Sequence, residues 1–318
     1  MEIGGQEWTR RLGGTGLDIT AVAVGGGVLG SNPRQFGYTV EAQQAIDMVQ
    51  AVLASPIRVL DTAAGYADGE SERRIGAAIA ASGGLPPDYL VITKVDGVQG
   101  DFSGARVRAS VRESKQRLGL DTLPLVHLHD VELYDEADLM APGGAVDTLV
   151  QLREEGEIGH IGLAGGDLRV VEHYFALGVF EVLLVHNRWT LVDRGAGDII
   201  DRAVSQGLGV FNAAVYGGGI LADPHGGHTT YAYTPAAPAT LEAVAHMAAA
   251  CERYGTDLAT AALQFSLRDS RVDGTIVGLS RVGRLAPLLE SISAELPDEL
   301  WEELETFVPA PENWLDRD

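Results

Sequence analysis

Cysteine is almost absent from this chain of 318 residues, which contains only Cys251. A single cysteine cannot form an intramolecular disulfide, so we expect a reducing, cytoplasmic location. The first residues, MEIGGQEWTRR, lack the apolar segment of a signal peptide. No apolar run approaches the roughly 18–20 residues that cross a bilayer, so we expect no membrane association.

Positive charge is also scarce. The chain has 23 Lys and Arg against 45 Asp and Glu, which gives a net charge of −22. This acidity repels phosphate backbones and anionic membranes, so we expect no nucleic-acid partner and interpret the charge mainly as a source of solubility. A phosphate-bearing cofactor remains compatible with it, because backbone amides, helix N-termini and a few arginines bind phosphate locally.

What the chain does contain is a regular alternation of apolar strands and amphipathic helical segments. Each strand shows little polar alternation, which is typical of a sheet buried on both faces. Eight strand–helix units follow an initial hairpin around the turn GGTG (13–16). They predict a (β/α)8 TIM barrel with an N-terminal β-hairpin and an additional C-terminal helix, formed by residues 1–318 as a single domain.

The expected elements have these boundaries. After a strand that ends at Gly25–Gly27, the strands are predicted at 57–61, 89–94, 123–129, 160–164, 181–187, 208–214 and 274–278. The first helix follows Thr39, a suitable N-cap, and helices are predicted at 240–254, at 256–269 and from about 282. We interpret the Gly-, Pro- and His-rich stretch 217–238 as an active-site lid, with a flexible surface loop as the alternative.

Four polar side chains fall at or just past the ends of three successive strands: Asp61, Tyr66, Lys94 and His129. In a barrel these ends meet on one rim, where the sites of this fold lie. A buried ammonium needs an anion, and Asp61 is the natural partner of Lys94. The cation is expected to lower the pKa of Tyr66 toward the working range, so that the phenol acts as acid or base in carbonyl reduction or alcohol oxidation.

His127 and His129 point the same way, because strand side chains alternate. His129 lies nearer the strand end, so we expect it to orient the substrate and His127 to be a buried, hydrogen-bonded residue one layer below. A zinc site that uses both with Asp130 would need a further His or Cys cluster, and we assign no metal.

The stretch VLDTAAGYADGESERRIGAAI resembles the signature of the aldo-keto reductases, as do TRRLGGTGLDITAVAVGGG, VITK, RLGLDTLPLVHLHD and GEIGHIGLAG in the same order. The HD after strand four, HNRWTLVDR, FNAAVYGGGIL and LPDELWEEL look most like the branch with sugar (D-threo-aldose and L-fucose type) and pyridoxal dehydrogenases. The resemblance implies a barrel that binds NADP or NAD and interconverts a carbonyl (aldehyde, ketone or sugar hemiacetal/lactone) and an alcohol. It assigns Tyr66 as proton donor, Lys94 and Asp61 as its partners, and His129 as the carbonyl orienter.

The resemblance also places the cofactor, although several aligned residues differ from the family pattern. Ala164 and Gly165 stand where a Ser-Asn pair clasps the carboxamide, His186 stands for a Gln, and Ala213 stands for a stacking aromatic. The expected cofactor-binding residues are Gly26, Gly27, Asp61, Ala164, His186, Asn187, Ala214, Tyr216, Gly217, Gly218, Gly278, Ser280, Arg281 and Arg284. Arg281 and Arg284 suit a 2′-phosphate, whereas the branch often prefers NAD, so the preference stays open.

Two alternatives remain. The departures at the cofactor positions leave open a catalytically weak, NAD(P)-binding regulatory subunit that senses redox state. A barrel hydrolase or isomerase that uses Asp61 and His129 would need no nicotinamide at all. The physiological substrate, the direction of reaction and the oligomeric state are not readable from the sequence.

Overall fold

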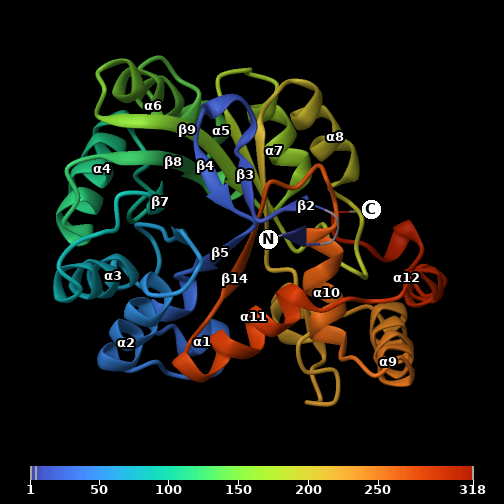
Figure 1. The fold of residues 1–318 in the computed structure, drawn as a ribbon. Coiled ribbons are helices and arrows are strands. Elements are labelled where there is room, and N and C mark those ends of the chain that lie inside the picture. Colours follow the sequence, from blue (N-terminus) through green and yellow to red (C-terminus); the bar gives the residue numbers. More distant parts are fainter. Residues whose placement is uncertain (1, 4–5, 317–318) are drawn as a thin grey trace.

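Eight parallel strands close into a barrel in the computed structural model of this chain, which describes residues 2–3 and 6–316 (Figure 1). Each strand pairs with the next in the order β5, β6, β7, β8, β9, β10, β11, β14, and β14 pairs back with β5. The strands are β5 Val22–Gly25, β6 Val59–Asp61, β7 Leu90–Val95, β8 Leu123–His129, β9 Ile158–Gly165, β10 Val182–His186, β11 Gly209–Ala213 and β14 Gly274–Gly278. The predicted (β/α)8 TIM barrel is confirmed.

Helices surround the barrel on its outer face, with α9, α10 and α12 side by side in one sector (Figure 1). Their bounds are α1 Pro33–Phe36, α2 Ala42–Leu53, α3 Glu70–Ala81, α4 Gly104–Leu118, α5 Glu136–Leu139, α6 Ala145–Glu154, α7 Leu168–Phe175, α8 Gly197–Ser205, α9 Pro238–Arg253, α10 Leu258–Leu267, α11 Leu285–Ser293 and α12 Asp298–Glu305. The last of these is the predicted additional C-terminal helix.

The predicted N-terminal hairpin is formed by β3 (Thr9–Arg11) and β4 (Asp18–Thr20), which pair antiparallel. It closes the end of the barrel at which the strands begin. Leu12 and Ile19 are buried in the apolar cluster that also contains Phe211 of β11. Gly13 has a φ of +45°, and a Cβ there would lie 2.2 Å from the backbone nitrogen of Gly209, so only glycine allows this contact. A shorter hairpin, β1 (Glu2–Ile3) with β2 (Gln6–Glu7), precedes it.

The sequence and the structure differ mainly at helix starts and in the loops. The helix predicted to start after Thr39 begins at Ala42, with Glu41 in the extended N-cap position and no side-chain cap bond. Two single-turn helices, α1 and α5, lie in loops where none was predicted. The 217–238 segment contains a hairpin of β12 (Thr230–Tyr231) and β13 (Thr234–Pro235), and its role as a lid stays a prediction.

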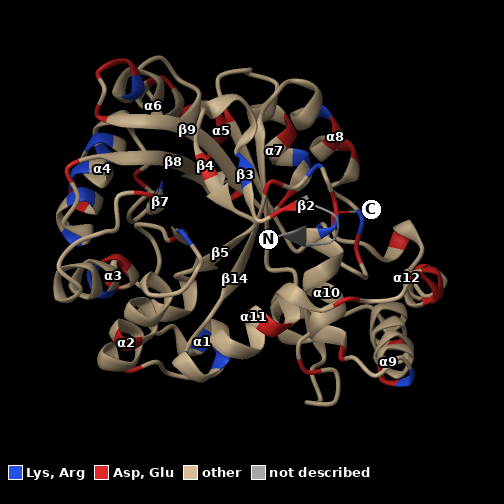
Figure 2. Ribbon diagram, viewed as in Figure 1, with Lys and Arg blue, Asp and Glu red and all other residues tan. Residues whose placement is uncertain are grey.

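Charged residues lie mostly on the outer helices and loops, while the barrel strands are nearly free of them (Figure 2). This distribution is expected when the strands are enclosed between an inner and an outer apolar layer. In the part of the chain that the structure describes, no helix has the length and apolar character needed to span a bilayer.

Candidate active site

Three neighbouring strands deliver the four predicted catalytic residues to one rim of the barrel. Asp61 ends β6, Lys94 is the last residue but one of β7, and His129 ends β8. The strands pair in the order β6, β7, β8, and the register sets Lys94 opposite His127. Tyr66 follows β6 in the loop before α3. The structure therefore brings together all four residues, as the parallel topology predicted.

Lys94 lies at the centre of this group and is 1% exposed. Its Nζ donates to Asp61 Oδ1 and Oδ2 at 2.7 and 2.8 Å, to the Thr62 carbonyl at 2.8 Å, and to Tyr66 Oη at 3.2 Å. Burial alone would lower the pKa of Lys94, but Asp61 and Tyr66 together raise it above the ordinary value. Lys94 is thus a permanent cation beside the phenol.

Tyr66 does not have the acidity expected from the sequence. Burial is the largest influence and raises its pKa above the ordinary value, and the Lys94 ammonium offsets only part of that effect. Burial disfavours the phenolate because the anion loses its hydration. The expectation of a lowered pKa is therefore wrong for the protein without ligands. Tyr66 is a neutral phenol at pH 7, which suits a proton donor.

The loop that carries Tyr66 is fixed by backbone hydrogen bonds to the neighbouring strand. The amide of Thr62 donates to the carbonyl of Ile92 at 2.8 Å, and that of Ala64 donates to the carbonyl of Lys94 at 3.1 Å. Beyond Tyr66 the chain turns into α3 through residues 67–69, all three with positive φ. Two of these are not glycine, so the tight turn is held by its surroundings.

His129 lies between two carboxylates and against the Tyr66 ring. Its Nδ1 is 2.7 Å from Asp96 Oδ1, and its Nε2 is 3.3 Å from Asp130 Oδ1. The His129 and Tyr66 rings meet edge to face, with centroids 5.7 Å apart. Burial would lower the pKa of His129, but Asp96 and Asp130 outweigh it and raise the pKa. The two carboxylates thus favour the imidazolium form, in which both ring nitrogens carry protons.

Asp96 was missed in the sequence, where the residues VDG at the end of β7 resemble the start of an ordinary loop. One signal was available: Asp96 is two residues after Lys94, so continued strand geometry directs both side chains to the same side. The structure buries Asp96 to 9% exposure.

His127 is buried, as predicted. Neither ring nitrogen makes a hydrogen bond of regular geometry among the described residues, but the Thr93 backbone interacts with the ring and favours its charged form. The predicted hydrogen bond is therefore present only as a weak contact. Burial, and then the charges of Lys94 and His129, hold its pKa well below the ordinary value, so the ring is neutral. Gly162 of β9 accommodates it, because a Cβ there would lie 2.3 Å from the His127 ring. His127 therefore packs beneath the site.

Potential metal-ligand atoms do approach one another on this rim. Those of Asp96, His129 and Asp130 lie within 4.8 Å, as do those of Asp130, Glu132 and His186. Asp96 already accepts hydrogen bonds on both oxygens, and Glu132 accepts the amides that follow β9. Such carboxylate groupings are common without an ion, and we assign no metal.

The predicted cofactor residues occupy the ends of the strands, or the loops that follow, on both sides of the catalytic group. On the first three strands concerned, Gly26 and Gly27 follow β5, Asp61 ends β6, and Ala164 lies in β9. The end of β10 carries His186 and Asn187, and the loop after β11 carries Ala214, Tyr216, Gly217 and Gly218. Gly278 ends β14, and the loop before α11 carries Ser280, Arg281 and Arg284. They come from six strands of one barrel end, so the topology gathers them around its mouth.

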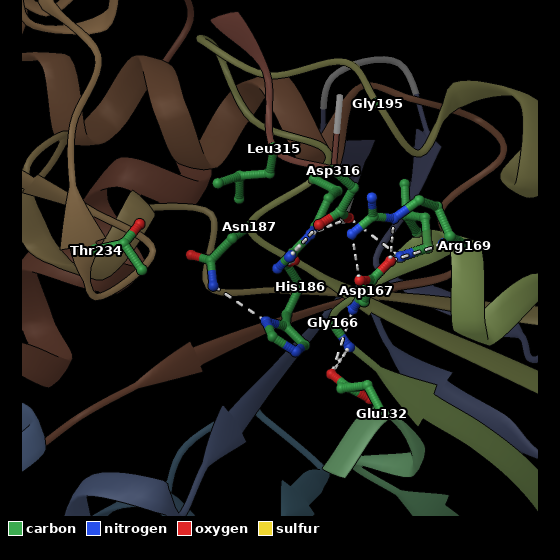
Figure 3. A network of polar contacts seen from close by, with 12 residues as sticks. Glu132, Gly166, Asp167, Arg169, His186, Asn187, Gly195, Thr234, Leu315 and Asp316 are labelled. Carbon is green, nitrogen blue, oxygen red and sulfur yellow. Dashed lines mark hydrogen bonds and ion pairs between the residues drawn. The ribbon is translucent and has the colours of Figure 1, made fainter. Parts of the chain in front are cut away.

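The best-defined polar group for a carboxamide is Asn187 (Figure 3). Asn187 is 1% exposed with φ +60°, its Nδ2 lies 3.0 Å from His186 Nδ1, and its Oδ1 has no partner among the described residues. A buried acceptor without a donor is costly, and an amide N–H would satisfy it. Ala164 has no polar side chain, and its carbonyl accepts the Asp130 amide. The residues present therefore fit a carboxamide at Asn187.

The adjoining sector of the mouth, after β11 and β14, suits phosphate. Gly217 and Gly218 have φ of +60° and +79°. Gly217 is buried against the Tyr231 ring, and Gly218 exposes backbone without a side chain. Arg281 and Arg284 are exposed before α11. Gln44 Nε2 donates to the Ser280 carbonyl at 2.6 Å and fixes that loop. Cationic side chains here can meet an anionic group despite the acidic chain.

The C-terminal segment covers the ends of β9 and β10 (Figure 3). Asp316 accepts two hydrogen bonds from Arg188, both at 2.9 Å, and one from the amide of Leu168. Asp193 accepts the amide of Leu315 at 2.8 Å, and burial raises the pKa of Asp193 to about 6. The C-terminal tail is thus fixed beside the carboxamide-binding side.

Comparisons with known proteins give one consistent result. The model of the family described as "Aldo/keto reductase family" matches residues 21–308. L-galactose dehydrogenase of Arabidopsis thaliana is 29% identical over 315 residues, which cover 96% of this chain and 95% of that protein. D-threo-aldose 1-dehydrogenase of a Pseudomonas species is 28% identical, covering 93% and 97%, and pyridoxal 4-dehydrogenase of Microbacterium luteolum is 25% identical, covering 92% and 95%.

Solved structures agree on the fold. An aldo-keto reductase from Bacillus halodurans, in its holo form, superposes with a TM-score of 0.76 at 20% identity, covering 98% of this chain and 99% of that one. A glycerol dehydrogenase from Gluconobacter oxydans gives 0.74 at 19% identity, covering 98% and 97%. At this identity the likeness supports the barrel alone.

Proposed function

This chain belongs to the aldo/keto reductase family and is an oxidoreductase that interconverts a carbonyl and an alcohol with a nicotinamide dinucleotide, and from that premise we propose that it is an aldose-type dehydrogenase with Tyr66 as its proton donor and acceptor. The observation that carries the proposal is the buried Lys94 ammonium, which contacts Asp61 at 2.7 Å and the Tyr66 hydroxyl at 3.2 Å.

Tyr66 moves the proton in this proposal. In the direction of reduction its phenol donates to the oxygen that becomes the alcohol, and Lys94 stabilises the phenolate left behind. In the direction of oxidation the phenolate accepts the hydroxyl proton. Because burial raises the pKa of Tyr66, the phenolate is scarce at neutral pH, and oxidation should accelerate as the pH rises through 8 and 9.

His129 orients the substrate. Its Nε2 faces away from Asp96, toward Asp130, and an imidazolium there donates a hydrogen bond to the carbonyl oxygen. That oxygen would lie between Tyr66 and His129, whose rings meet edge to face. Asp61 does not contact the substrate in this scheme. It balances the charge of Lys94 and so keeps the ammonium buried at the site.

The dinucleotide would be held by backbone glycines and a few side chains. Asn187, with its unpartnered Oδ1, would bind the carboxamide beside His186. Gly217 and Gly218 would admit the pyrophosphate, and Arg281 and Arg284 would face the adenosine phosphate. When bound, the nicotinamide supplies the hydride acceptor or donor.

The substrate class follows from the relatives and from the rim. Two curated relatives are named for the oxidation of sugars and one for pyridoxal. In this chain Asp130 lies beside His129, and its carboxylate can accept hydrogen bonds from hydroxyl groups next to the reacting carbon. We therefore expect a sugar hemiacetal to be oxidised to a lactone in preference to a simple aldehyde without hydroxyl groups.

The test compares wild type with Tyr66→Phe on a panel of aldoses, pyridoxal and benzaldehyde, with NAD and NADP each titrated by fluorescence. The variant should bind the dinucleotide normally and lose about 10²- to 10⁴-fold in kcat, since phenylalanine keeps the shape and removes the proton. Tyr38→Phe, on an exposed ring, is the matched control. Full turnover by Tyr66→Phe would contradict the assignment, and Arg284→Ala should weaken NADP more than NAD if that arginine meets the 2′-phosphate.

A further inference from the structure

Asp96 is a buried carboxylate on the active-site rim with no role in the proton transfer described above. It follows β7 and is 9% exposed. Its Oδ1 lies 2.7 Å from His129 Nδ1, and its Oδ2 accepts the amide of Gly65 at 2.6 Å. Both oxygens are therefore occupied, each by a group that belongs to the catalytic site or adjoins it.

The contact with Gly65 ties Asp96 to the other half of the site. Gly65 immediately precedes Tyr66, so one carboxylate holds the tyrosine loop with one oxygen and the histidine ring with the other. A Cβ at position 65 would lie 2.8 Å from Asp96 Cγ, which shows how closely the loop approaches the carboxylate. The bridge thus joins the loop of Tyr66 to His129, and these two rings meet edge to face.

The charge of His129 depends on several neighbours. Asp96 and Asp130 favour the imidazolium, while burial and Lys94 oppose it. The titratable groups that face His129 or its Asp96 partner come from β6, β7, β8, β10 and the loops between them: Asp61, Tyr66, Lys94, Asp96, His127, Asp130, Tyr134 and His186. Asp96 makes the shortest contact with the ring among the described residues and is more buried than Asp130.

We propose that Asp96 is a positioning residue for the reaction: it fixes the His129 ring with Nδ1–H directed at its carboxylate, keeps the imidazole charged, and so presents Nε2–H to the substrate oxygen. The same carboxylate sets the distance between that donor and the Tyr66 hydroxyl through Gly65. A neutral ring held in this orientation would present a lone pair at Nε2, which repels a carbonyl oxygen. The part that concerns turnover rests on the proposed function, whereas the state of the ring does not.

A direct test measures the His129 ring itself, without substrate or cofactor. The proton and nitrogen shifts of the imidazole are followed by NMR against pH in wild type and Asp96→Asn, with His129→Gln to assign the signal. Wild type should titrate above the ordinary value of about 6.5, and Asp96→Asn should titrate at least about one pH unit lower than wild type. Asp101→Asn, an exposed aspartate in the same loop, should leave the midpoint unchanged.

Kinetics provide the second readout. In the direction of reduction, Asp96→Asn should lower kcat at least about tenfold at pH 8, and the alkaline fall of its pH profile should move toward lower pH. Dinucleotide affinity and the melting temperature should stay near wild type, which separates positioning from folding. Gly65→Ala, which displaces the carboxylate from the other side, should shift the midpoint in the same direction and checks the bridge independently.

The outcomes are distinguishable. A wild-type His129 that titrates at or below about 6.5, or an unchanged titration midpoint in Asp96→Asn, overturns the proposal regardless of the kinetic results. If Asp96→Asn fails to fold, the His129 titration midpoints of wild type and of Gly65→Ala still test the proposal. If the midpoint shifts as expected but no panel substrate turns over in wild type, the positioning role of Asp96 on the ring stands and the proposed substrate class fails.

Discussion

Replacing Lys94 by methionine should separate the structural role of the buried ion pair from its chemical role. The substitution keeps the length of the side chain and removes a charge that is 1% exposed. It leaves the Asp61 carboxylate buried and without a partner, because Lys94 is the only side chain that hydrogen-bonds to it among the described residues. Breaking one partner of such a pair costs about 3–5 kcal/mol. At about 2 °C per kcal/mol for a chain of this size, the melting temperature should fall by roughly 6–10 °C.

The double variant Asp61→Asn with Lys94→Met removes the stranded charge. Its free energy of unfolding should return to within about 2 kcal/mol of wild type. Its kcat should nevertheless stay about 10²-fold or more below wild type, because Tyr66 still lacks the neighbouring cation. Stability would thus recover while catalysis would not.

The assay is urea denaturation followed by circular dichroism, run between pH 4 and pH 8. The deficit of Lys94→Met should shrink at the acid end, since protonation of Asp61 removes the unpaired charge. Lys115→Met is the control, because Lys115 pairs with a half-exposed Glu157 and should lose about 0–1 kcal/mol. A Lys94→Met protein as stable as wild type, or a double variant no more stable than the single one, would refute the reasoning.

Three further predictions concern other parts of the molecule. Gly76→Ala places a Cβ 2.0 Å from the Arg117 carbonyl oxygen where α3 packs on α4, so the free energy of unfolding in urea should fall by about 1–3 kcal/mol. Gly283→Ala, in open space, is the control and should be as stable as wild type. Equal stability of the two variants would contradict this prediction. Burial raises the pKa of Asp193 to about 6, so the protonated carboxyl contributes stability that is present below about pH 4 and is lost as the pH rises through 6. Over that range the free energy of unfolding of Asp193→Asn should rise by up to about 3 kcal/mol relative to wild type. A difference that stays constant with pH would contradict the raised pKa. Tyr231→Phe removes a buried hydroxyl that bonds the barrel, and should make β12–β13 the first site of limited proteolysis, at a cost of about 1 kcal/mol.

Much of the barrel was predictable because two periodicities repeat along the chain. The strands that end at Asp61, Lys94 and His129 were predicted to within two residues, since apolar runs bounded by polar loops mark them clearly. The joint position of these residues then followed from parallel topology. The start of α2 was not predictable from Thr39, because the chain enters that helix through an extended Glu41 without a cap bond.

What the sequence did not reveal depends on burial and on contacts between loops. The pKa of Tyr66 is set mainly by its loss of hydration on burial. The sequence shows that a lysine is available but does not show how deeply the phenol is buried. Asp96 gains its importance from Gly65 and His129, which belong to other parts of the chain. His127 has no side-chain partner among the described residues, and only the Thr93 backbone interacts with its ring.

The enclosure of Lys94 has a practical consequence for labelling. The chain contains only two lysines, Lys94 and Lys115, and the first is surrounded by oxygens and almost inaccessible. Reagents that modify amines should therefore react with Lys115, whose side chain is 17% exposed, before they reach Lys94. Slow modification of Lys94 would then report transient exposure of its Nζ, and reductive methylation with a ¹³C label would measure that rate.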